Sequence, residues 1–419
     1  YCAEFEKIIS EARRNVHLRP EIIIMADLNN EMDAPEGVVT YRDFVKDGSP
    51  ENPVRKDKPS IYDETTRFFT SGTTNLPKAV PVNDINEVLS AHDVIMHFPL
   101  SPKDVTMNLT PWFHRGGLHS GGPCPTLYIG GTMVILRDFT PRLALQYVSL
   151  YHITFLIGAP TVIDMLCRIQ ETNPRDISSL HGIVLMGSPL DKEPCKRYMK
   201  VLTPNIFNGY GTTETFWNVF LRPYDLPDKA GYAGGACTDD DVRVVRVDTT
   251  KHVSPDELVP MDKETVGEVV IFAPNKSTFA YYDNPKTTEE KFHNGWLYTG
   301  DLATWDEHAY ITIIGRKDDM IVSAGENIYP VQVESILNEH PKVAESLVFG
   351  IPDPKRGSVI AALIRPSDPS LTEKEMKQFC MNHPMLAPYK RPRIFRFVKE
   401  LPHNATGKLL HKLPPDFKF

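Results

Sequence analysis

The middle of the chain alternates apolar strands with helices, and this alternation constrains the fold more than any other feature. Residues 141–151, which begin with a proline, and residues 161–171 are predicted helices. Such alternation indicates an α/β fold with a largely parallel sheet, whose ligands bind beyond the carboxyl ends of the strands. The predicted strands between and around these helices are 132–136, 153–157, 183–186 and 205–207.

Glycine-containing segments follow several of these strands. Gly158, Gly187 and residues 209–211 each come directly after a predicted strand. Because the carboxyl ends of parallel strands meet at one edge of a sheet, we expect these segments to be loops that line one cleft.

The remainder of the chain suggests a second domain. Short β segments are expected from about residue 240, and the charged residues 315–319 connect them to a small α+β unit. We therefore place a boundary near Asp318, with a large domain at 1–317 and a small one at 318–419. Other predicted elements are helices at 4–14, 84–97, 331–339 and 372–382, and strands at 22–25, 242–247, 267–272, 296–298, 310–314, 346–349, 359–364 and 394–398.

Composition excludes several classes of protein. The 419 residues carry a net charge of -8, from 46 basic and 54 acidic side chains, which argues against a nucleic-acid partner. The six cysteines are far apart, so we expect reduced thiols in a cytoplasmic protein rather than a zinc site or a disulfide scaffold. No apolar run is long enough to span a bilayer, and no secretory signal is visible.

Residues 70–78 form the strongest single motif. Thr70 to Thr74 supply hydroxyls around Gly72, and Lys78 follows a proline. Backbone N–H groups, hydroxyls and a lysine can wrap phosphate oxygens, although the spacing differs from that of the Walker loop. Taken alone, the motif is equally a polar turn between two strands.

Four later segments carry further polar groups, each of which also has an ordinary structural explanation. In 210–214 a carboxylate follows a Gly turn and could hold magnesium, or be a solvated loop residue. In 298–301 a carboxylate after a strand could bind ribose hydroxyls, or form a turn. Residues 323–330 are expected to be a small-residue loop before a helix, and 402–408 place a lysine on a Gly turn.

Together and in this order, these segments identify the chain by resemblance. It resembles the adenylate-forming superfamily of acyl- and aryl-CoA ligases, amino-acid adenylation domains and luciferases, and is most similar to an acyl- or aryl-CoA ligase. The motifs that carry the resemblance are 70–80, 210–214, 298–301, 315–330 and 402–408. The resemblance implies a large ATP- and acyl-binding domain, with parallel-rich sheets and a β-rich subdomain, and a small mobile α+β domain.

The resemblance also implies a two-step reaction. A carboxylate attacks the α-phosphorus of ATP to give an acyl-adenylate and pyrophosphate, and a thiol, usually that of CoA, then displaces AMP. Thr213, Glu214 as magnesium ligand, His114 and Lys408 are the implied catalytic residues. The implied ATP contacts are Thr70, Ser71, Gly72, Thr73, Thr74, Lys78, Gly187, Ser188, Pro189, Asn208, Gly209, Tyr210, Gly211, Thr212, Asp301 and Arg316.

The small domain of this family rotates between the two half-reactions. By resemblance, Asp318 is the hinge, and rotation withdraws Lys408 and brings residues 323–328 to the site. The implied CoA contacts are Gly325, Arg356, Gly357, Lys390 and Arg391.

The acid itself is the main unknown. His114 is expected to gate the thiol tunnel, with a packed interior histidine as the alternative. An aromatic-rich pocket favours an aryl or a short- to medium-chain alkyl acid. The expected pocket residues are Trp112, Phe113, Met186, Phe216 and Trp217.

Two departures from the family pattern keep other functions open. Asn75 and Ala79 stand where the phosphate loop usually has glycines. A sizeable N-terminal portion ahead of 22–45 is also expected from the family and is not present. The alternatives are a carrier-loading adenylation enzyme and a catalytically weak sensor that binds nucleotide or acyl-adenylate. Oligomeric state is not indicated, and a homo-oligomer stays open.

Overall fold

The structure is a computed structural model that describes residues 1–16, 20–27, 32–51, 54, 57–70, 77–248, 251–403 and 409–411. It divides into two compact units, residues 1–59 and 60–419. The boundary expected at Asp318 lies inside the second unit and stays a prediction. Among the described residues, no helix is both long and apolar enough to cross a membrane.

The first unit contains short elements. The 3₁₀ helix η1 (Ala3–Phe5) continues into α1 (Glu6–Asn15), close to the predicted helix at 4–14. Two short strands, β1 (Ile24–Met25) and β2 (Val39–Thr40), pair in parallel, and α2 (Tyr41–Val45) follows directly.

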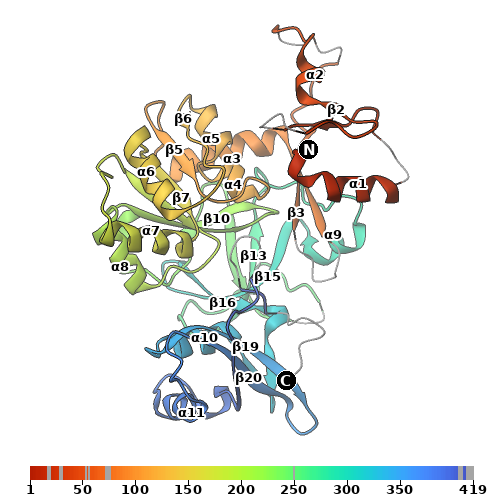
Figure 1. The fold of residues 1–419 in the computed structure, drawn as a ribbon. Coiled ribbons are helices and arrows are strands. Elements are labelled where there is room, and N and C mark those ends of the chain that lie inside the picture. The colour runs from red at the N-terminus through yellow and green to blue at the C-terminus, as the bar shows by residue number, and fades with distance from the viewer. Residues whose placement is uncertain are drawn as a thin grey trace. The chain divides into compact units, whose positions relative to one another are not determined.

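A seven-stranded sheet with the order β11-β10-β9-β8-β7-β5-β6 forms the centre of the second unit (Figure 1). Strands β5 to β9 run parallel to their neighbours, whereas β10 and β11 are antiparallel. The expected parallel-rich α/β sheet is therefore confirmed. Its strands are β5 (Val105–Asn108), β6 (Thr132–Met133), β7 (Phe155–Gly158), β8 (Gly182–Met186), β9 (Ile206–Thr212), β10 (Phe216–Leu221) and β11 (Gly235–Ala236).

Helices cover both faces of this sheet. Leu156 and Leu185 face one apolar cluster, whereas their neighbours Ile157 and Val184 face another. This alternation follows from the period of two along a strand, and burial on both faces explains the continuous apolar runs. The first cluster also contains residues of α6 (Pro141–Tyr151), α7 (Pro160–Thr172) and α8 (Lys192–Val201), and the second contains Val94 of α3 (Asp84–His97).

A second sheet, β12-β13-β15-β14 with β16 paired to β15, forms the β-rich subdomain. A separate hairpin consists of β3 and β4. The hairpin strands are β3 (Glu64–Thr70) and β4 (Lys78–Asn83), and the strands of the second sheet are β12 (Asp241–Val245), β13 (Gly267–Phe272), β14 (Phe292–His293), β15 (Trp296–Trp305) and β16 (Ile311–Arg316). The remaining elements of this part of the chain are α4 (Arg115–His119), α5 (Pro123–Tyr128), η2 (Pro223–Asp225) and α9 (Pro285–Lys291).

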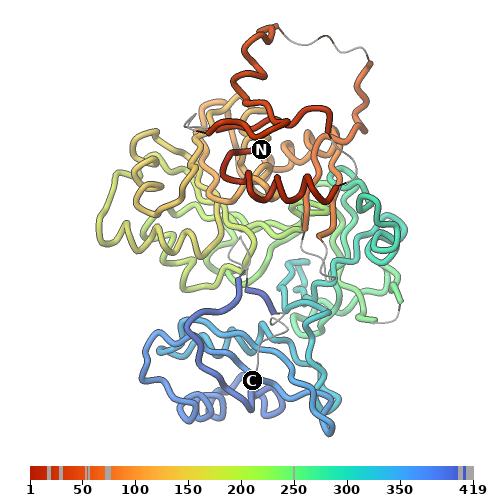
Figure 2. The backbone as a smooth tube through the Cα atoms, turned by 45° about the vertical axis from the view of Figure 1, so that its right-hand side comes forward, coloured from red at the N-terminus to blue at the C-terminus, as the bar shows by residue number. Residues whose placement is uncertain are grey.

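The C-terminal elements, which are blue in Figure 2, have an apolar core of their own. Val333, Val348, Ile360 and Met376 pack together there, fully or almost fully buried. The elements are η3 (Lys317–Asp319), β17 (Ile321–Ser323), β18 (Glu326–Ile328), α10 (Pro330–Asn338), β19 (Val343–Asp353), β20 (Gly357–Pro366), α11 (Glu373–Asn382), η4 (Pro388–Lys390) and β21 (Ile394–Phe397).

Two segments expected to be loops are strands instead, and a third is a hairpin whose turn is at residues 324–325. Residues 208–212 belong to β9, because β10 pairs with them in antiparallel register. A Cβ on Gly211 would lie 1.6 Å from the Phe216 carbonyl oxygen, so the hairpin needs a glycine at that position. Residues 298–301 lie inside β15 rather than after a strand, and 323–328 form the β17–β18 hairpin.

Candidate active site

The β3–β4 hairpin carries the two ends of the phosphate-binding motif. Thr70, the last residue of β3, and Lys78, the first residue of β4, are register partners. Ser71, Gly72, Thr73, Thr74 and Asn75 lie outside the described residues, and their expected roles stay predictions. Ala79 pairs with Phe69 inside the hairpin, and its carbonyl accepts the Tyr282 N–H at 2.8 Å. Ala79 is thus an ordinary strand residue that does not need the conformational freedom of glycine.

Three residues of the expected ATP set come together at the end of β9. The Tyr210 hydroxyl donates to Asp301 Oδ2 at 2.6 Å, and Arg316 donates from NH1 to Asp301 Oδ1 at 2.7 Å. Pairing of β15 with β16 places Asp301 directly opposite Arg316. Asp301 and Arg316 are 15 residues apart in sequence, and the antiparallel pairing of β15 with β16 is what brings them together.

Burial dominates the electrostatics of this group. Burial, and then the Asp301 charge, raises the pKa of Tyr210 well above its usual value, so the hydroxyl stays protonated and donates. For Arg316, burial lowers the pKa, but the Asp301 carboxylate more than offsets this and the net shift is upward. The guanidinium therefore stays charged in a partly dehydrated site.

Glu214 lies in the turn between β9 and β10. The Tyr281 hydroxyl donates to its Oε1 at 2.5 Å, and the buried Arg115 donates to the Thr213 carbonyl at 2.8 Å. Within the described part of the chain, no hydrogen bond to Glu214 Oε2 is observed. One fixed and one uncommitted carboxylate oxygen suit Mg²⁺, which prefers oxygen ligands and keeps several waters.

Two buried polar atoms near the expected ligand positions lack a partner among the described residues. They are Oδ1 of Asn208 and Nε2 of His114. Buried polar groups are normally hydrogen-bonded, so each is a candidate for contact with a ligand. Burial lowers the pKa of His114, which favours a neutral imidazole that can accept or donate a proton.

The expected acyl-pocket residues are placed unevenly. Phe216 and Trp217 stack at 5.2 Å between ring centroids inside a buried aromatic cluster, and Met186 belongs to the same cluster. Trp112 is half-buried and Phe113 is exposed, with its ring 4.5 Å from that of His114. A Cβ on Gly116 would lie 2.7 Å from the Met186 sulfur, so the segment after His114 packs closely on this cluster.

The other expected sites are described only in part. Gly187 and Ser188 follow β8 directly, and Pro189 comes next. The Ala324 N–H donates to the Arg356 carbonyl at 2.8 Å, which joins the Gly325 turn to Arg356 and Gly357. Lys390 instead donates to Gln332 at 3.2 Å, and Arg391 donates to the Leu386 carbonyl at 3.1 Å. Asp318 lies in η3, and Lys408 is outside the described residues.

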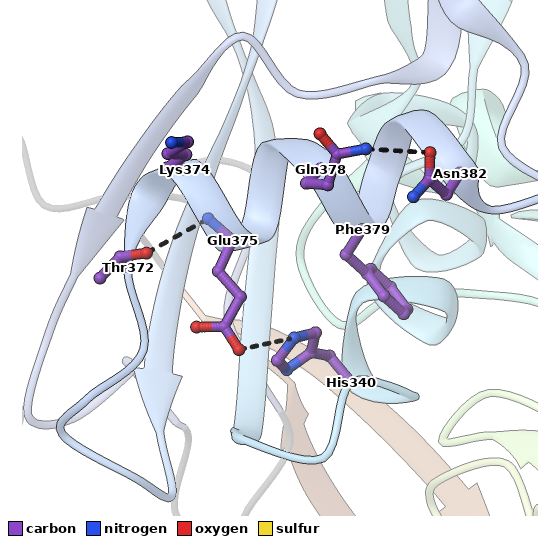
Figure 3. Close-up of a pocket in the computed structure, with 7 residues that line it drawn as sticks. All are labelled: His340, Thr372, Lys374, Glu375, Gln378, Phe379 and Asn382. Carbon is purple, nitrogen blue, oxygen red and sulfur yellow. Dashed lines mark hydrogen bonds and ion pairs between the residues drawn. The ribbon is translucent and has the colours of Figure 1, made fainter.

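A hollow of about 460 Å³ lies beside α11 and is lined by none of these residues (Figure 3). His340 Nε2 lies 3.7 Å from Glu375 Oε1, and Gln378 donates to Asn382 at 3.1 Å, so its polar side chains are largely paired with one another. The convergence of polar groups around Asp301 and Glu214 therefore identifies the candidate site better than the size of a hollow does.

Sequence reasoning missed Tyr281, Arg115, Lys276 and Lys291. Lys276 is 2% exposed, and its ammonium lies 2.8 Å from Asp93 Oδ2 and 2.7 Å from Asp240 Oδ2. Arg115 donates to the Lys276 carbonyl at 2.8 Å. These partners are 36 to 183 residues apart, so no local pattern indicated them. The one local feature that could have indicated Lys276 is its position four residues after β13, an apolar strand that is buried almost throughout.

Comparison with known proteins adds independent findings. The family model described as AMP-binding enzyme matches residues 4–282, and that described as AMP-binding enzyme C-terminal domain matches 332–408. Feruloyl-CoA synthase from an Amycolatopsis species is 31% identical over 370 residues, which cover 88% of this chain and 72% of that protein. 2-Succinylbenzoate–CoA ligase from Bacillus cereus (strain Q1) is 32% identical over 371 residues, with 88% and 73% covered.

Solved structures of CoA ligases are also similar to this chain. The structure of O-succinylbenzoate coenzyme A synthetase from Bacillus subtilis in complex with AMP matches with a TM-score of 0.80 at 28% identity, covering 94% of this chain and 78% of that one. An anthranilate CoA ligase in complex with anthranoyl-AMP matches with a TM-score of 0.82 at 26% identity, covering 97% and 75%.

Proposed function

The chain belongs to the AMP-binding enzyme family of acid–thiol ligases, and from this premise we propose that it joins an aryl or a short- to medium-chain carboxylic acid to CoA. The observation that carries the proposal is the hydrogen bonding of Asp301 with both Tyr210 and Arg316, together with a Glu214 carboxylate of which one oxygen has no hydrogen bond from the described residues. The relatives described above act, by their names, on feruloyl, succinylbenzoyl and anthranoyl groups, which favours an aryl acid.

In the proposed first step, a carboxylate oxygen of the acid attacks the α-phosphorus of ATP. The bond from the α-phosphorus to the bridging oxygen breaks, and pyrophosphate leaves with that oxygen. Asp301 and Arg316 would hold the ribose, Asn208 and Tyr210 the adenine, and Lys78 the outer phosphates. Magnesium would neutralise phosphate charge next to Glu214, and Lys408 would bridge the carboxylate and the phosphate.

In the proposed second step, the CoA sulfur attacks the acyl carbonyl and the bond to the AMP oxygen breaks. The thiol proton passes to solvent, AMP leaves with its phosphate oxygen, and His114, whose pKa burial lowers, would gate the thiol tunnel. The turn at Gly325 and the adjoining Arg356 would meet the CoA thiol arm and nucleotide after rotation at Asp318.

The carrier-loading and sensor alternatives remain distinguishable by experiment. Pyrophosphate release should be measured with ATP and magnesium across a panel of aryl and alkyl acids, with and without CoA. Release with formation of a CoA thioester supports the proposal, and release without any thioester favours a carrier protein as acceptor. Tight ATP binding with no release for any acid would favour the sensor. The ordinary strand geometry of Ala79 argues against the sensor.

A further inference from the structure

Lys291 and Arg316 both lie against Gly300. A Cβ on Gly300 would be 3.3 Å from Lys291 Nζ and 3.1 Å from a terminal nitrogen of Arg316. Gly300 has a φ of +75°, so the position favours glycine both for its backbone conformation and for the space that the two cations occupy. Lys291 is the last residue of α9, and Arg316 is the last residue of β16.

Lys291 has no carboxylate partner in the described part of the chain. Two carboxylates of the β-rich subdomain are already engaged, Asp301 with Arg316 at 2.7 Å and Glu268 with Lys317 at 2.7 Å. Asp318 and Glu268 attract Lys291 electrostatically, but neither forms an ion pair with it among the described residues. Lys78 likewise makes no ion pair among the described residues, and its ammonium lies 5.4 Å from the centre of the Tyr281 ring.

The surroundings of Lys291 are therefore unfavourable for a cation unless an anion is present. Its pKa is lowered by burial and by the positive charges of Arg316 and Lys78, which together outweigh the opposing attraction of Asp318 and Glu268. Partly buried charges in proteins are normally paired, so an unpaired ammonium beside two other cations indicates a place for a negatively charged ligand.

We propose that Lys291 binds the phosphate chain of the nucleotide, between the ribose site at Asp301 and Arg316 and the phosphate motif at Lys78. This inference rests on the proposed ATP site and adds to it a residue on a different element. A polyphosphate supplies the missing negative charge, and a lysine binds it as a mobile point charge. The ligand chemistry is a nucleoside triphosphate or pyrophosphate.

The test compares Lys291→Met with Lys286→Met, which removes an exposed lysine from the same helix. Titration calorimetry should use ATP, AMP, pyrophosphate and adenosine separately. Losing a charged contact should weaken ATP binding by about 10- to 100-fold in Lys291→Met and leave adenosine binding unchanged. Equal ATP affinities in the two variants, or an equal loss for adenosine, would overturn the inference.

A second measurement separates binding from folding. Because the surroundings of Lys291 are unfavourable for its charge, Lys291→Met without nucleotide should melt at or above the wild-type melting temperature. Added ATP should raise the melting temperature of Lys291→Met less than that of the wild type. A lower melting temperature with an undiminished ATP shift would show a structural role instead. If the wild type binds no ATP, the proposed function fails as well. If the wild type binds ATP and releases pyrophosphate while Lys291→Met keeps full ATP affinity, only this inference fails.

Discussion

Replacing the buried Lys276 by methionine should destabilise the protein strongly. The change keeps a long flexible side chain but removes the ammonium that contacts Asp93, Asp240 and the Trp217 carbonyl. Removing one partner of a buried ion pair typically costs about 3–5 kcal/mol, because the other charge stays buried without compensation. His97 still contacts Asp93 at 3.0 Å and Asn218 still donates to Asp240 at 2.9 Å, so we expect about 3–5 kcal/mol at pH 7 rather than twice that amount.

The pH dependence provides the sharper test. Burial raises the pKa of Asp240 to about 6, although Lys276 opposes the shift. A folded-state pKa above the unfolded value means that the native state holds the proton more tightly, so stability falls as pH rises towards that value. Without Lys276 the pKa of Asp240 should rise further. The loss of unfolding free energy in Lys276→Met should therefore become smaller as the pH is lowered from 8 to 5. The double variant Lys276→Met with Asp240→Asn should recover part of that loss at pH 8.

Urea unfolding at several pH values, followed by fluorescence of the buried Trp217 and its fellow tryptophans, measures these differences. Lys286→Met is the control, because this lysine is exposed. A deficit under about 1 kcal/mol at pH 7, the size expected for a surface pair, would refute the reasoning. So would a deficit that is the same at pH 5 and pH 8, since it would show that no carboxylate depends on the ammonium.

Three further predictions concern catalysis. Lys408→Ala should lower acid-dependent pyrophosphate release by about 100-fold or more, and spare thioester formation from a supplied acyl-adenylate; equal loss of both half-reactions would contradict domain rotation. Asp318→Pro should do the reverse, and intact thioester formation in that variant would contradict the hinge. Asp301→Asn should raise the KM for ATP by about 10- to 100-fold while the KM for the acid changes little, and steady-state kinetics with each substrate varied in turn would reveal any other pattern.

Local signals in the sequence were sufficient for many elements. The helices at 84–97 and 141–151 have the predicted bounds, because Asn83 and Thr140 cap them and a proline opens the second. Strand 267–272 also matches, since its apolar run is buried almost throughout. In each case the physical cause lies within a few residues of the element.

Non-local pairing explains the errors. Residues 208–212 contain glycines and hydroxyls that suggest a loop, but the apolar residues 216–221 fold back and extend β9. The site contacts are non-local too: Tyr210 reaches Asp301 over 91 residues and Tyr281 reaches Glu214 over 67. The sequence indicated Asp301, Glu214 and Tyr210 through their motifs, but it contained no sign that Tyr210 contacts Asp301 and no sign of Tyr281 at all.

One segment, residues 275–291, contacts most parts of the candidate site. The Asn275 carbonyl accepts from Asn86 at 3.1 Å, and Thr278 donates to the Pro81 carbonyl at 2.9 Å. The Tyr282 N–H donates to the Ala79 carbonyl of β4. The Tyr281 hydroxyl donates to the Glu214 carboxylate, and Lys291 lies beside Gly300. This segment reaches the side of the site proposed to bind ATP from the β-rich subdomain, whereas Trp112, Phe113 and Met186 come from the seven-stranded sheet and the connections beside it. Substitutions of those residues in 275–291 that make these contacts should therefore alter ATP binding before they alter the choice of acid, whereas the exposed Lys286 should tolerate replacement.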